Sequence, residues 1–370
     1  GYGAGTSFAD WNMGRVIEAL DRSKYAENTI VIVTSDNGYH LGDKNRWGKG
    51  TLWGRAAAVP FLVRGPGVKP GTTSKPVGLV DVYPTLVDVA GIEAPGHVLD
   101  GKSLVPWFSE PQKDTGGANV FAYGKNNTSV SDGDWRYIRY QDGSEELYDL
   151  SDDPLEFSNV AAAAEHSGQS RRLAEHIPTS WAPSVGGRRE VKQPGEPDFF
   201  PNENLVAQRT DKPNIIVVFT DDQGYGDAGV YGSPDIRTPN LDRMADEGMR
   251  FTDFYVSDAV CSASRAGLLS GHRAAVTGAK GVYWPGQEGL SPQVVTIAEI
   301  LKPAGYATAL YGKWHLGERP QHGPLAQGFD DYFGVPYSND MYPHPDHVLS
   351  DDVRFTSGYD EQRYRADLER

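Results

Sequence analysis

Hydrophobic residues occur in two blocks of the chain, and in each block short β-branched runs alternate with segments of helical spacing. The first block has apolar positions at helical intervals over Ser7–Leu20, followed by the run Ile30–Val33. The second opens with the run Ile215–Phe219 and continues with a helix-like segment over Thr238–Glu247. Short runs that are apolar at every position are typical of parallel strands buried on both faces. The pattern predicts an α/β fold with a mixed, mainly parallel sheet flanked by helices.

Weaker patterns add further elements to both blocks. Strands are expected at Ala58–Val63, Arg250–Tyr255 and Tyr306–Tyr311, and helices at Val80–Ala90 and Thr296–Leu301.

Between the two blocks the pattern changes twice. Short aromatic segments fill Asn119–Leu150, and Asp142-Gly143 between two of them is a hairpin signal, so we expect a small antiparallel sheet. A polar stretch rich in proline and glycine follows and is typical of a linker or an extended arm. We therefore divide the chain into an α/β part at 1–112, a small antiparallel subdomain at 113–184, a linker or arm at 185–212, and a second α/β part at 213–370.

Composition limits the classes of partner. The formal net charge of −15 argues against nucleic acid, which needs a basic surface, although a local pocket can still bind a small anion. No apolar run is long enough to span a membrane, and the first residues lack the pattern of a signal peptide. A single cysteine excludes an internal disulfide. The compartment stays open.

Acidic and amide side chains follow both long apolar runs. Asp36 and Asn37 come shortly after the first run, and Asp221 and Asp222 come shortly after the second. Ligands bind at the carboxyl ends of strands in open α/β sheets, and clustered carboxylates there favour a hard divalent cation such as Ca²⁺ or Mg²⁺. The alternative is a pair of solvated turns.

Two further segments contain candidate catalytic residues. Cys261 precedes residues that favour a helix, with Ser262 or Ser264 as its cap, which places the cysteine at a helix N-terminus where anions are favoured. Lys313 and His315 follow a predicted strand and would face the same side of an extended segment. The alternatives are a buried structural cysteine and a surface lysine beside a packed histidine.

Together these segments resemble the sulfatase family. The segment Cys261-Ser-Ala-Ser-Arg265 resembles the sulfatase signature, and Leu269-Ser-Gly271 nearly continues it. The Asp-Asp pair, the Gly-Lys-Trp-His segment at 312–315 and the Ser-Asp-Asn-Gly segment at 35–38 match further family hallmarks. The second α/β part is similar to the arylsulfatase A-like branch, and the first to the iduronate- and choline-sulfatase side.

The resemblance implies an alkaline-phosphatase-like fold and a set of roles. A separate formylglycine-generating enzyme would oxidise Cys261 to formylglycine, whose hydrated aldehyde attacks the sulfur of a sulfate monoester. The implied metal ligands are Asp36, Asn37, Asp221, Asp222 and the modified Cys261, with Ca²⁺ expected and Mg²⁺ as the alternative. Arg265 would orient the nucleophile, Lys49 and Lys313 would neutralise sulfate oxygens, and His315 would steady the hydrate. Small sulfated substrates are expected, whether aryl, sugar or choline sulfates, and the family favours a periplasmic or extracellular location.

The order of the segments differs from the family's. The part that ends family members comes first here, which indicates a circular permutation or a fusion of two sulfatase pieces. The family also carries a strand of Phe-Phe-Leu-Tyr type that ends near a leaving-group histidine, and the sequence contains no such segment. Its absence would leave a central sheet position empty, with His40, His322, His344 and His347 as the remaining candidates for the acid. Two other readings are a phosphate or phosphonate ester hydrolase of the same superfamily and a fragment with impaired catalysis.

Overall fold

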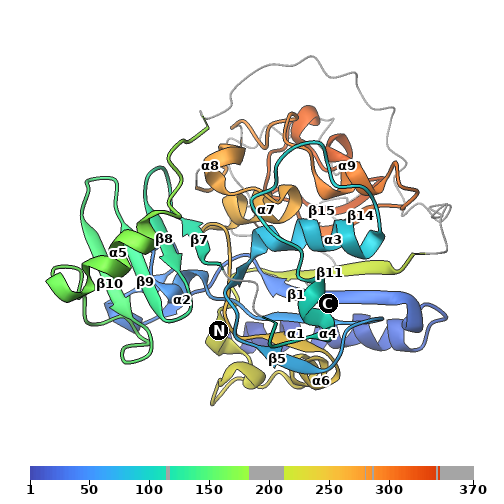
Figure 1. The fold of residues 1–370 in the computed structure, drawn as a ribbon. Helices are drawn as coiled ribbons and strands as arrows, with labels where there is room; N and C mark the ends of the chain where they lie inside the picture. The colour runs from blue at the N-terminus through green and yellow to red at the C-terminus, as the bar shows by residue number, and fades with distance from the viewer. Residues whose placement is uncertain (114–116, 183–211, 280, 286, 339–340, 342–370) are drawn as a thin grey trace.

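The computed structural model describes residues 1–113, 117–182, 212–279, 281–285, 287–338 and 341. These residues form an α/β body and a separate small antiparallel sheet beside it, seen at the left of Figure 1. The segment predicted as a linker, 185–212, lies outside the described residues except for its last one. The four-part division of the chain therefore stays a prediction.

The two long apolar runs become neighbouring strands of the main sheet. Strand β1 (Thr29–Ser35) runs parallel to β11 (Asn214–Thr220), in register along all seven residues of each. The sheet has the order β11-β1-β4-β12-β5 and is completed by β4 (Phe61–Arg64), β12 (Met249–Phe251) and β5 (Gly71–Thr73). Strand β4 is antiparallel to both of its neighbours, whereas β5 is parallel to β12.

Two short parallel pairs extend the α/β body. They join β6 (Val77–Gly78) to β13 (Phe254–Tyr255) and β14 (Ala309–Lys313) to β15 (Asp331–Val335). The predicted α/β class with mixed, mainly parallel strands is confirmed. Strand bounds were less accurate. The strand expected at Ala58–Val63 begins only at Phe61, after the short helix α2 (Gly54–Ala57), because Pro60 has no backbone N–H for strand pairing and Ala58 forms only an isolated bridge with Tyr255.

Helices cover both faces of the main sheet (Figure 1). Helices α3 (Val82–Ala90), α7 (Cys261–Ser270) and α9 (Ile297–Leu301) pack on one face, and α1 (Tyr2–Asp21) and α6 (Pro239–Glu247) on the other. Helix α1 buries Met13, Ile17 and Leu20 against the sheet. Phe8 and Trp11 do not join this face; they are 63% and 54% exposed and stack on each other.

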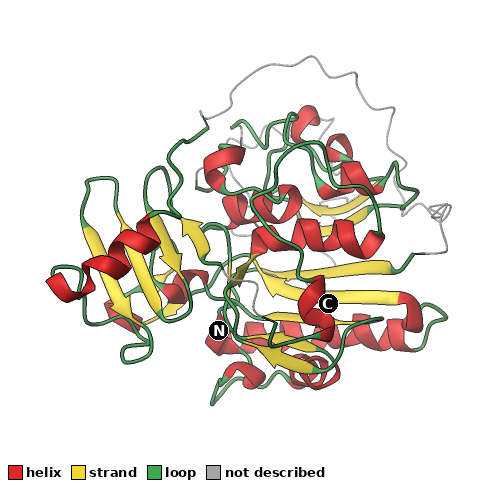
Figure 2. Cartoon of the chain, in the orientation of Figure 1, coloured by secondary structure: helices red, strands yellow, loops and turns green. Residues whose placement is uncertain are grey.

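The small subdomain is a four-stranded meander with the order β10-β9-β8-β7 (Figure 2). Its strands are β7 (Asn119–Ala122), β8 (Thr128–Ser131), β9 (Trp135–Arg139) and β10 (Glu145–Asp149). The expected hairpin at Asp142-Gly143 joins the last two strands, with Gly143 in the left-handed region at φ 86°. Helix α5 (Ser167–Ala174) covers one face and buries Leu173 there.

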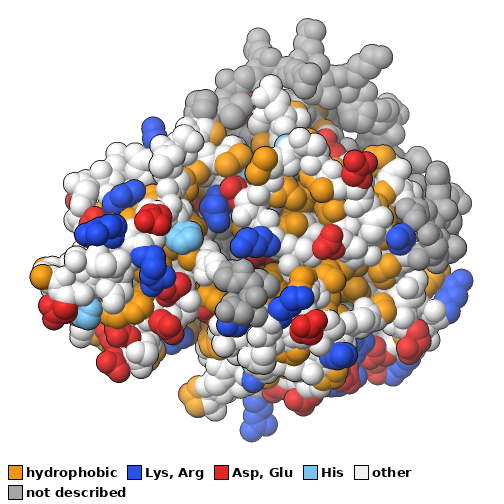
Figure 3. Space-filling view, in the orientation of Figure 1, with side chains coloured by type: hydrophobic (Ala, Val, Ile, Leu, Met, Phe, Trp, Pro, Cys, Tyr) orange, Lys and Arg blue, Asp and Glu red, His pale blue; other side chains and the backbone are white. Residues whose placement is uncertain are grey.

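Further short elements of the described residues are β2 (His40–Leu41), β3 (Trp47–Gly48), α4 (Val105–Ser109) and α8 (Ala274–Thr277). Helix α4 buries Trp107 and Phe108 in the same core cluster as α3. On the face drawn in Figure 3, acidic and basic side chains are interspersed, while apolar side chains gather over the α/β body. No helix in the described part of the chain is both long enough and apolar enough to cross a membrane.

Candidate active site

Three carboxylate side chains lie together where strands β1 and β11 end. The parallel register pairs Ser35 with Thr220, so Asp36 and Asp221 follow at neighbouring strand ends. Oxygen atoms of Asp36, Asp221 and Asp222 lie within 4.8 Å of one another. Asp222 adopts a left-handed conformation with φ 57°, and its backbone N–H donates to Asp36 Oδ1 at 3.1 Å. The turn lets both adjacent aspartates face one point, which an extended strand would not allow.

Each of these carboxylates has its own cationic partner. Arg265 Nε donates to Asp36 Oδ2 at 3.1 Å, and Lys313 Nζ donates to Asp221 Oδ2 at 2.8 Å. Lys49 pairs with Asp222. The structure thus brings together residues from both α/β parts of the sequence.

Burial and the cationic partners shift the pKa values of Asp36 and Asp221 in opposite directions. Burial raises the pKa of Asp36 to about 6, against the opposing charge of Arg265. Burial also works against ionisation of Asp221, but Lys313 and Arg265 outweigh it and lower the pKa to about 2. The carboxylate of Asp221, with the stronger cationic surroundings, is therefore the more readily ionised of the two.

The oxygen donors suit a hard divalent cation. Carboxylate and amide oxygens are the ligands that Ca²⁺ and Mg²⁺ prefer. Asn37 Nδ2 donates to Asp222 Oδ1 at 2.7 Å, which leaves Asn37 Oδ1 buried and without a hydrogen-bond partner among the described residues. A buried oxygen in this state carries a desolvation cost that a bound cation would offset. The acidic cluster with this oxygen could therefore bind a metal.

Cys261 is the first residue of helix α7 and is buried. Burial raises the pKa of its thiol, although the charges of Lys313 and Lys49 oppose the shift. A thiol held in its protonated form is a weak nucleophile. The predicted serine cap is wrong: Val260 is the N-cap residue, and Ser262 Oγ instead accepts from the backbone N–H of Tyr283 at 3.0 Å.

Arg265 is fixed on three sides. Its Nη2 lies 3.0 Å from Asp36 Oδ2, and its Nη1 donates to the carbonyl oxygen of Lys313 at 2.9 Å. The guanidinium also lies over the ring of Phe219, 5.1 Å from the ring centre. These contacts join helix α7 to the ends of β1, β11 and β14, so one side chain sets the distances between the elements that carry the site.

His315 lies near the acidic cluster, but it does not share an extended segment with Lys313 as the sequence predicted. Strand β14 ends at Lys313, and His315 has φ 60°, so the alternation of an extended segment does not apply to the pair. Burial, together with the charges of Lys313 and Arg265, lowers the pKa of His315 to about 3. The carbonyl oxygen of Tyr283 lies 3.1 Å from Nε2, so Nε2 carries the proton of this neutral ring and Nδ1 is an acceptor.

Sequence reasoning missed Tyr2, which lies beside the acidic turn. Its hydroxyl donates to the carbonyl oxygen of Asp222 and contacts Asp227. Nothing in the local sequence indicated this, because the contact joins the first turn of α1 to a turn more than two hundred residues later.

The four other candidate histidines gain no support as the acid. His40 Nε2 contacts Thr51 Oγ1 at 2.8 Å. His322 uses both ring nitrogens, one on the carbonyl oxygen of Leu290 and one on Glu288. His344 and His347 lie outside the described residues.

Removing one carboxylate should weaken metal binding without unfolding the protein. We expect Ca²⁺ to raise the Tm of the unaltered protein, because a ligand that binds only the folded state stabilises it. Asp221→Asn should need at least about 100-fold more Ca²⁺ for the same rise, since one unit charge beside the ion contributes several kcal/mol. Thermal unfolding with Ca²⁺ or EDTA measures this, with Asp142→Asn, on the exposed hairpin, as the control. Equal Ca²⁺ dependence of the two variants would contradict a metal at this cluster.

Comparisons with known proteins identify the family of the chain. The sulfatase family model matches residues 1–92 and 213–366, well over half of the chain. Human arylsulfatase A is 49% identical over 135 residues, which are 35% of this chain and 27% of that protein. Pig N-acetylgalactosamine-6-sulfatase is 50% identical over 134 residues, 34% of this chain and 26% of that protein. The chain thus spans about a quarter of the length of these curated relatives.

Solved structures match less of the chain. A structure in complex with its substrate D-glucosamine-2-N,6-O-disulfate is 28% identical, with a TM-score of 0.40, over 44% of this chain and 36% of that one. The phosphonate monoester hydrolase of Agrobacterium radiobacter is 27% identical, also with a TM-score of 0.40 and the same two coverages. These partial overlaps add no weight to the assignment, which rests on the family model: the chain belongs to the sulfatase family.

Proposed function

We propose that this protein hydrolyses sulfate monoesters with a nucleophile made from Cys261. The observation that carries the proposal is the convergence of two parts of the sequence: the carboxylates of Asp36, Asp221 and Asp222 cluster at one edge of the sheet, and the charges of Lys49 and Lys313 act on the buried thiol of Cys261. Positive groups placed where negative charge develops lower the barrier for such a reaction.

The protonated thiol itself supports a modified nucleophile. Because burial raises the pKa of Cys261, the unmodified side chain is poorly suited to attack sulfur. Conversion to formylglycine by a separate generating enzyme would supply a hydrated aldehyde with two hydroxyls. One oxygen attacks sulfur and the alcohol leaves; the second hydroxyl then loses its proton as the aldehyde re-forms and the C–O bond to sulfate breaks. Water need not attack sulfur.

The neighbouring residues would then have separate tasks. Lys49 and Lys313 neutralise sulfate oxygens, and Arg265 holds helix α7 against Asp36, which positions residue 261. His315, with Nδ1 as its acceptor, is suited to take a hydrogen bond from the hydrate. Asp36, Asn37, Asp221 and Asp222 would hold Ca²⁺, or Mg²⁺ as the alternative, together with residue 261. A bound cation would supply a positive charge for a sulfate oxygen and favour the ionised nucleophile.

For the substrate, we propose a sulfated sugar. The proposal is supported by the relative named N-acetylgalactosamine-6-sulfatase, which is 50% identical over 134 residues. Aryl sulfates serve as convenient probes of the same bond. The order of the two α/β parts, with the Asp36 strand before the Cys261 helix, is the order that circular permutation would produce, and we retain permutation as a proposal.

Turnover of matched esters tests the proposal. After coexpression with a formylglycine-generating enzyme and with Ca²⁺ present, kcat/KM for p-nitrophenyl sulfate should exceed that for p-nitrophenyl phosphate. Faster phosphate turnover that persists in Cys261→Ala would instead assign the site to phosphate or phosphonate esters. Turnover of neither ester, in protein whose Cys261 is converted, would indicate a fragment with impaired catalysis.

A further inference from the structure

The turn that carries Asp221 and Asp222 has an unfavourable backbone conformation. Asp222 lies in the left-handed region, with φ 57°, where a residue with a side chain is strained. Such conformations persist only where the surrounding structure holds them. An extended backbone would direct the two neighbouring carboxylates to opposite sides, so the contacts that hold this turn also hold the acidic cluster together.

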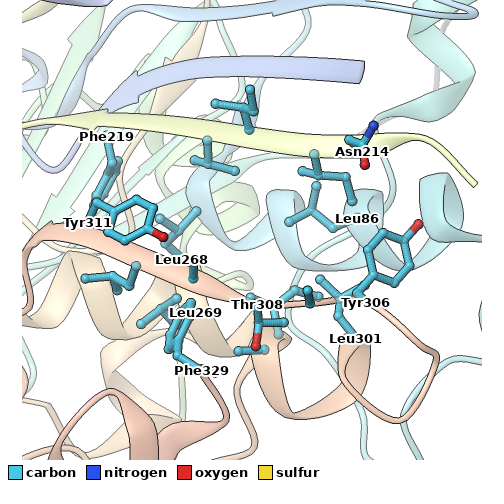
Figure 4. Close-up of a pocket in the computed structure, with 18 of the residues that line it drawn as sticks. Leu86, Asn214, Phe219, Leu268, Leu269, Leu301, Tyr306, Thr308, Tyr311 and Phe329 are labelled. Carbon is cyan, nitrogen blue, oxygen red and sulfur yellow. The ribbon is translucent and has the colours of Figure 1, made fainter. Parts of the chain in front are cut away.

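One contact of the turn comes from the segment after the neighbouring strand β1. The backbone N–H of Asp222 donates at 3.1 Å to Oδ1 of Asp36, which directly follows that strand. Strand β11 also borders a cavity of about 930 Å³, which Asp221 lines together with apolar side chains such as Phe219 and Leu268 (Figure 4). Apolar side chains cannot donate a hydrogen bond, so the carbonyl oxygen of Asp222 needs a donor from another element.

Tyr2, in the first turn of α1, supplies that donor. Its hydroxyl donates to the carbonyl oxygen of Asp222 at 2.5 Å, and Oδ2 of Asp227 lies 2.5 Å from the same hydroxyl. The backbone N–H of Gly224 donates to that Asp227 oxygen at 2.7 Å. Tyr2 and Asp227 therefore hold the peptide groups on both sides of Gln223.

The ring of Tyr2 contacts the segment that follows β1. It stacks on the ring of Tyr39 with the ring centres 5.2 Å apart, and Tyr39 lies two residues after Asn37. Asn37 Nδ2 in turn donates to Asp222 Oδ1 at 2.7 Å. Tyr2 thus contacts both chain segments that supply the proposed metal ligands, through its hydroxyl on one and its ring on the other.

We propose that Tyr2 is a positioning residue for the cation: its hydroxyl holds the left-handed turn at Asp222, so that the carboxylates of Asp221 and Asp222 face the same ion. Tyr2 acts through the turn and is not itself a ligand. Without the hydroxyl, the turn would relax toward an extended backbone, which separates the two carboxylates and lowers the affinity for Ca²⁺. The inference rests on the metal site of the proposed function, but not on its nucleophile or its substrate.

Tyr2→Phe removes the hydroxyl and keeps the stacked ring, so it tests the hydrogen bonds alone. The measurement is the Tm as a function of Ca²⁺ concentration, starting from protein treated with EDTA. We expect Tyr2→Phe to need about fivefold more Ca²⁺ than the unaltered protein for the same rise in Tm, which corresponds to about 1 kcal/mol for a lost hydrogen bond. Tyr25→Phe, at a tyrosine that is 51% exposed and precedes β1, should match the unaltered protein.

Dependence on Ca²⁺ separates positioning from a general loss of stability. If Tyr2→Phe lowered the Tm equally in EDTA and at every Ca²⁺ concentration, the hydroxyl would have only a structural role and the proposal would be overturned. A Tm of the unaltered protein that does not rise with Ca²⁺ would overturn it as well. The Tm needs no turnover, so the result stands whether or not the unaltered protein hydrolyses an aryl sulfate.

Discussion

Replacing Cys261 with alanine should lower the rate of sulfate ester hydrolysis by at least about 10⁴-fold, because a nucleophile that forms a covalent intermediate has no substitute in the site. Alanine keeps the start of helix α7 and removes only one sulfur atom from a buried position, so the fold should persist. The measurement is kcat for an aryl sulfate in protein matured alongside the generating enzyme, with circular dichroism to verify folding.

A control variant and a Ca²⁺ titration separate this effect from structural damage. Val276→Ala, on the exposed side of the neighbouring helix α8, should keep the rate of the unaltered protein. Cys261→Ala should still gain stability from Ca²⁺, since four oxygen donors remain. A loss of less than about tenfold in Cys261→Ala would show that residue 261 does not attack the ester.

The second large effect is a loss of stability at the interface between the small sheet and the α/β body. Arg136 on β9 is 1% exposed, forms a buried ion pair with Glu156 and lies 4.7 Å from the ring centre of Tyr255. Glu156 Oε2 in turn accepts from the backbone N–H of Gly54 at 2.9 Å. Arg136→Met would leave the carboxylate buried without its cation. We expect the free energy of unfolding to fall by about 3–5 kcal/mol.

Urea unfolding measures this loss. The matched control is Arg22→Met, which removes the arginine of an exposed ion pair with Glu18 and should change stability by no more than about 1 kcal/mol. A cost below about 1 kcal/mol for Arg136→Met would mean that the pair does not couple the small sheet to the body. Glu156 would then have found water or another partner.

The sequence predicted the parts of the fold that depend on local pattern. Runs such as Ile30–Val33 and Ile215–Phe219 are apolar at every position, which is typical of strands in a covered sheet. Strand β1 is buried at every position as expected, whereas β11 is only half-buried after its exposed first residue. Acidic residues directly after such strands were expected at one edge, and the register of β1 with β11 brings Asp36 and Asp221 there. The roles of these residues stay predictions that the variants above test.

Contacts between distant segments could not be predicted in the same way. The hydroxyl of Ser262 does not cap α7 because it accepts a hydrogen bond from the backbone N–H of Tyr283, a residue distant in sequence. The conformation of His315 depends on where β14 ends, and strand ends are set by the neighbouring strand rather than by local pattern. The order of the sheet, with β4 antiparallel inside it, likewise follows from packing between both halves of the chain.

The state of residue 261 is the most direct test of the central claim. Trypsin releases it in the peptide Phe251–Arg265, where mass spectrometry and hydrazide labelling give the fraction converted to aldehyde. Across preparations made with and without the generating enzyme, turnover of an aryl sulfate should rise in proportion to that fraction, and hydrazide should abolish it. Equal turnover from protein whose Cys261 remains a thiol would contradict the account.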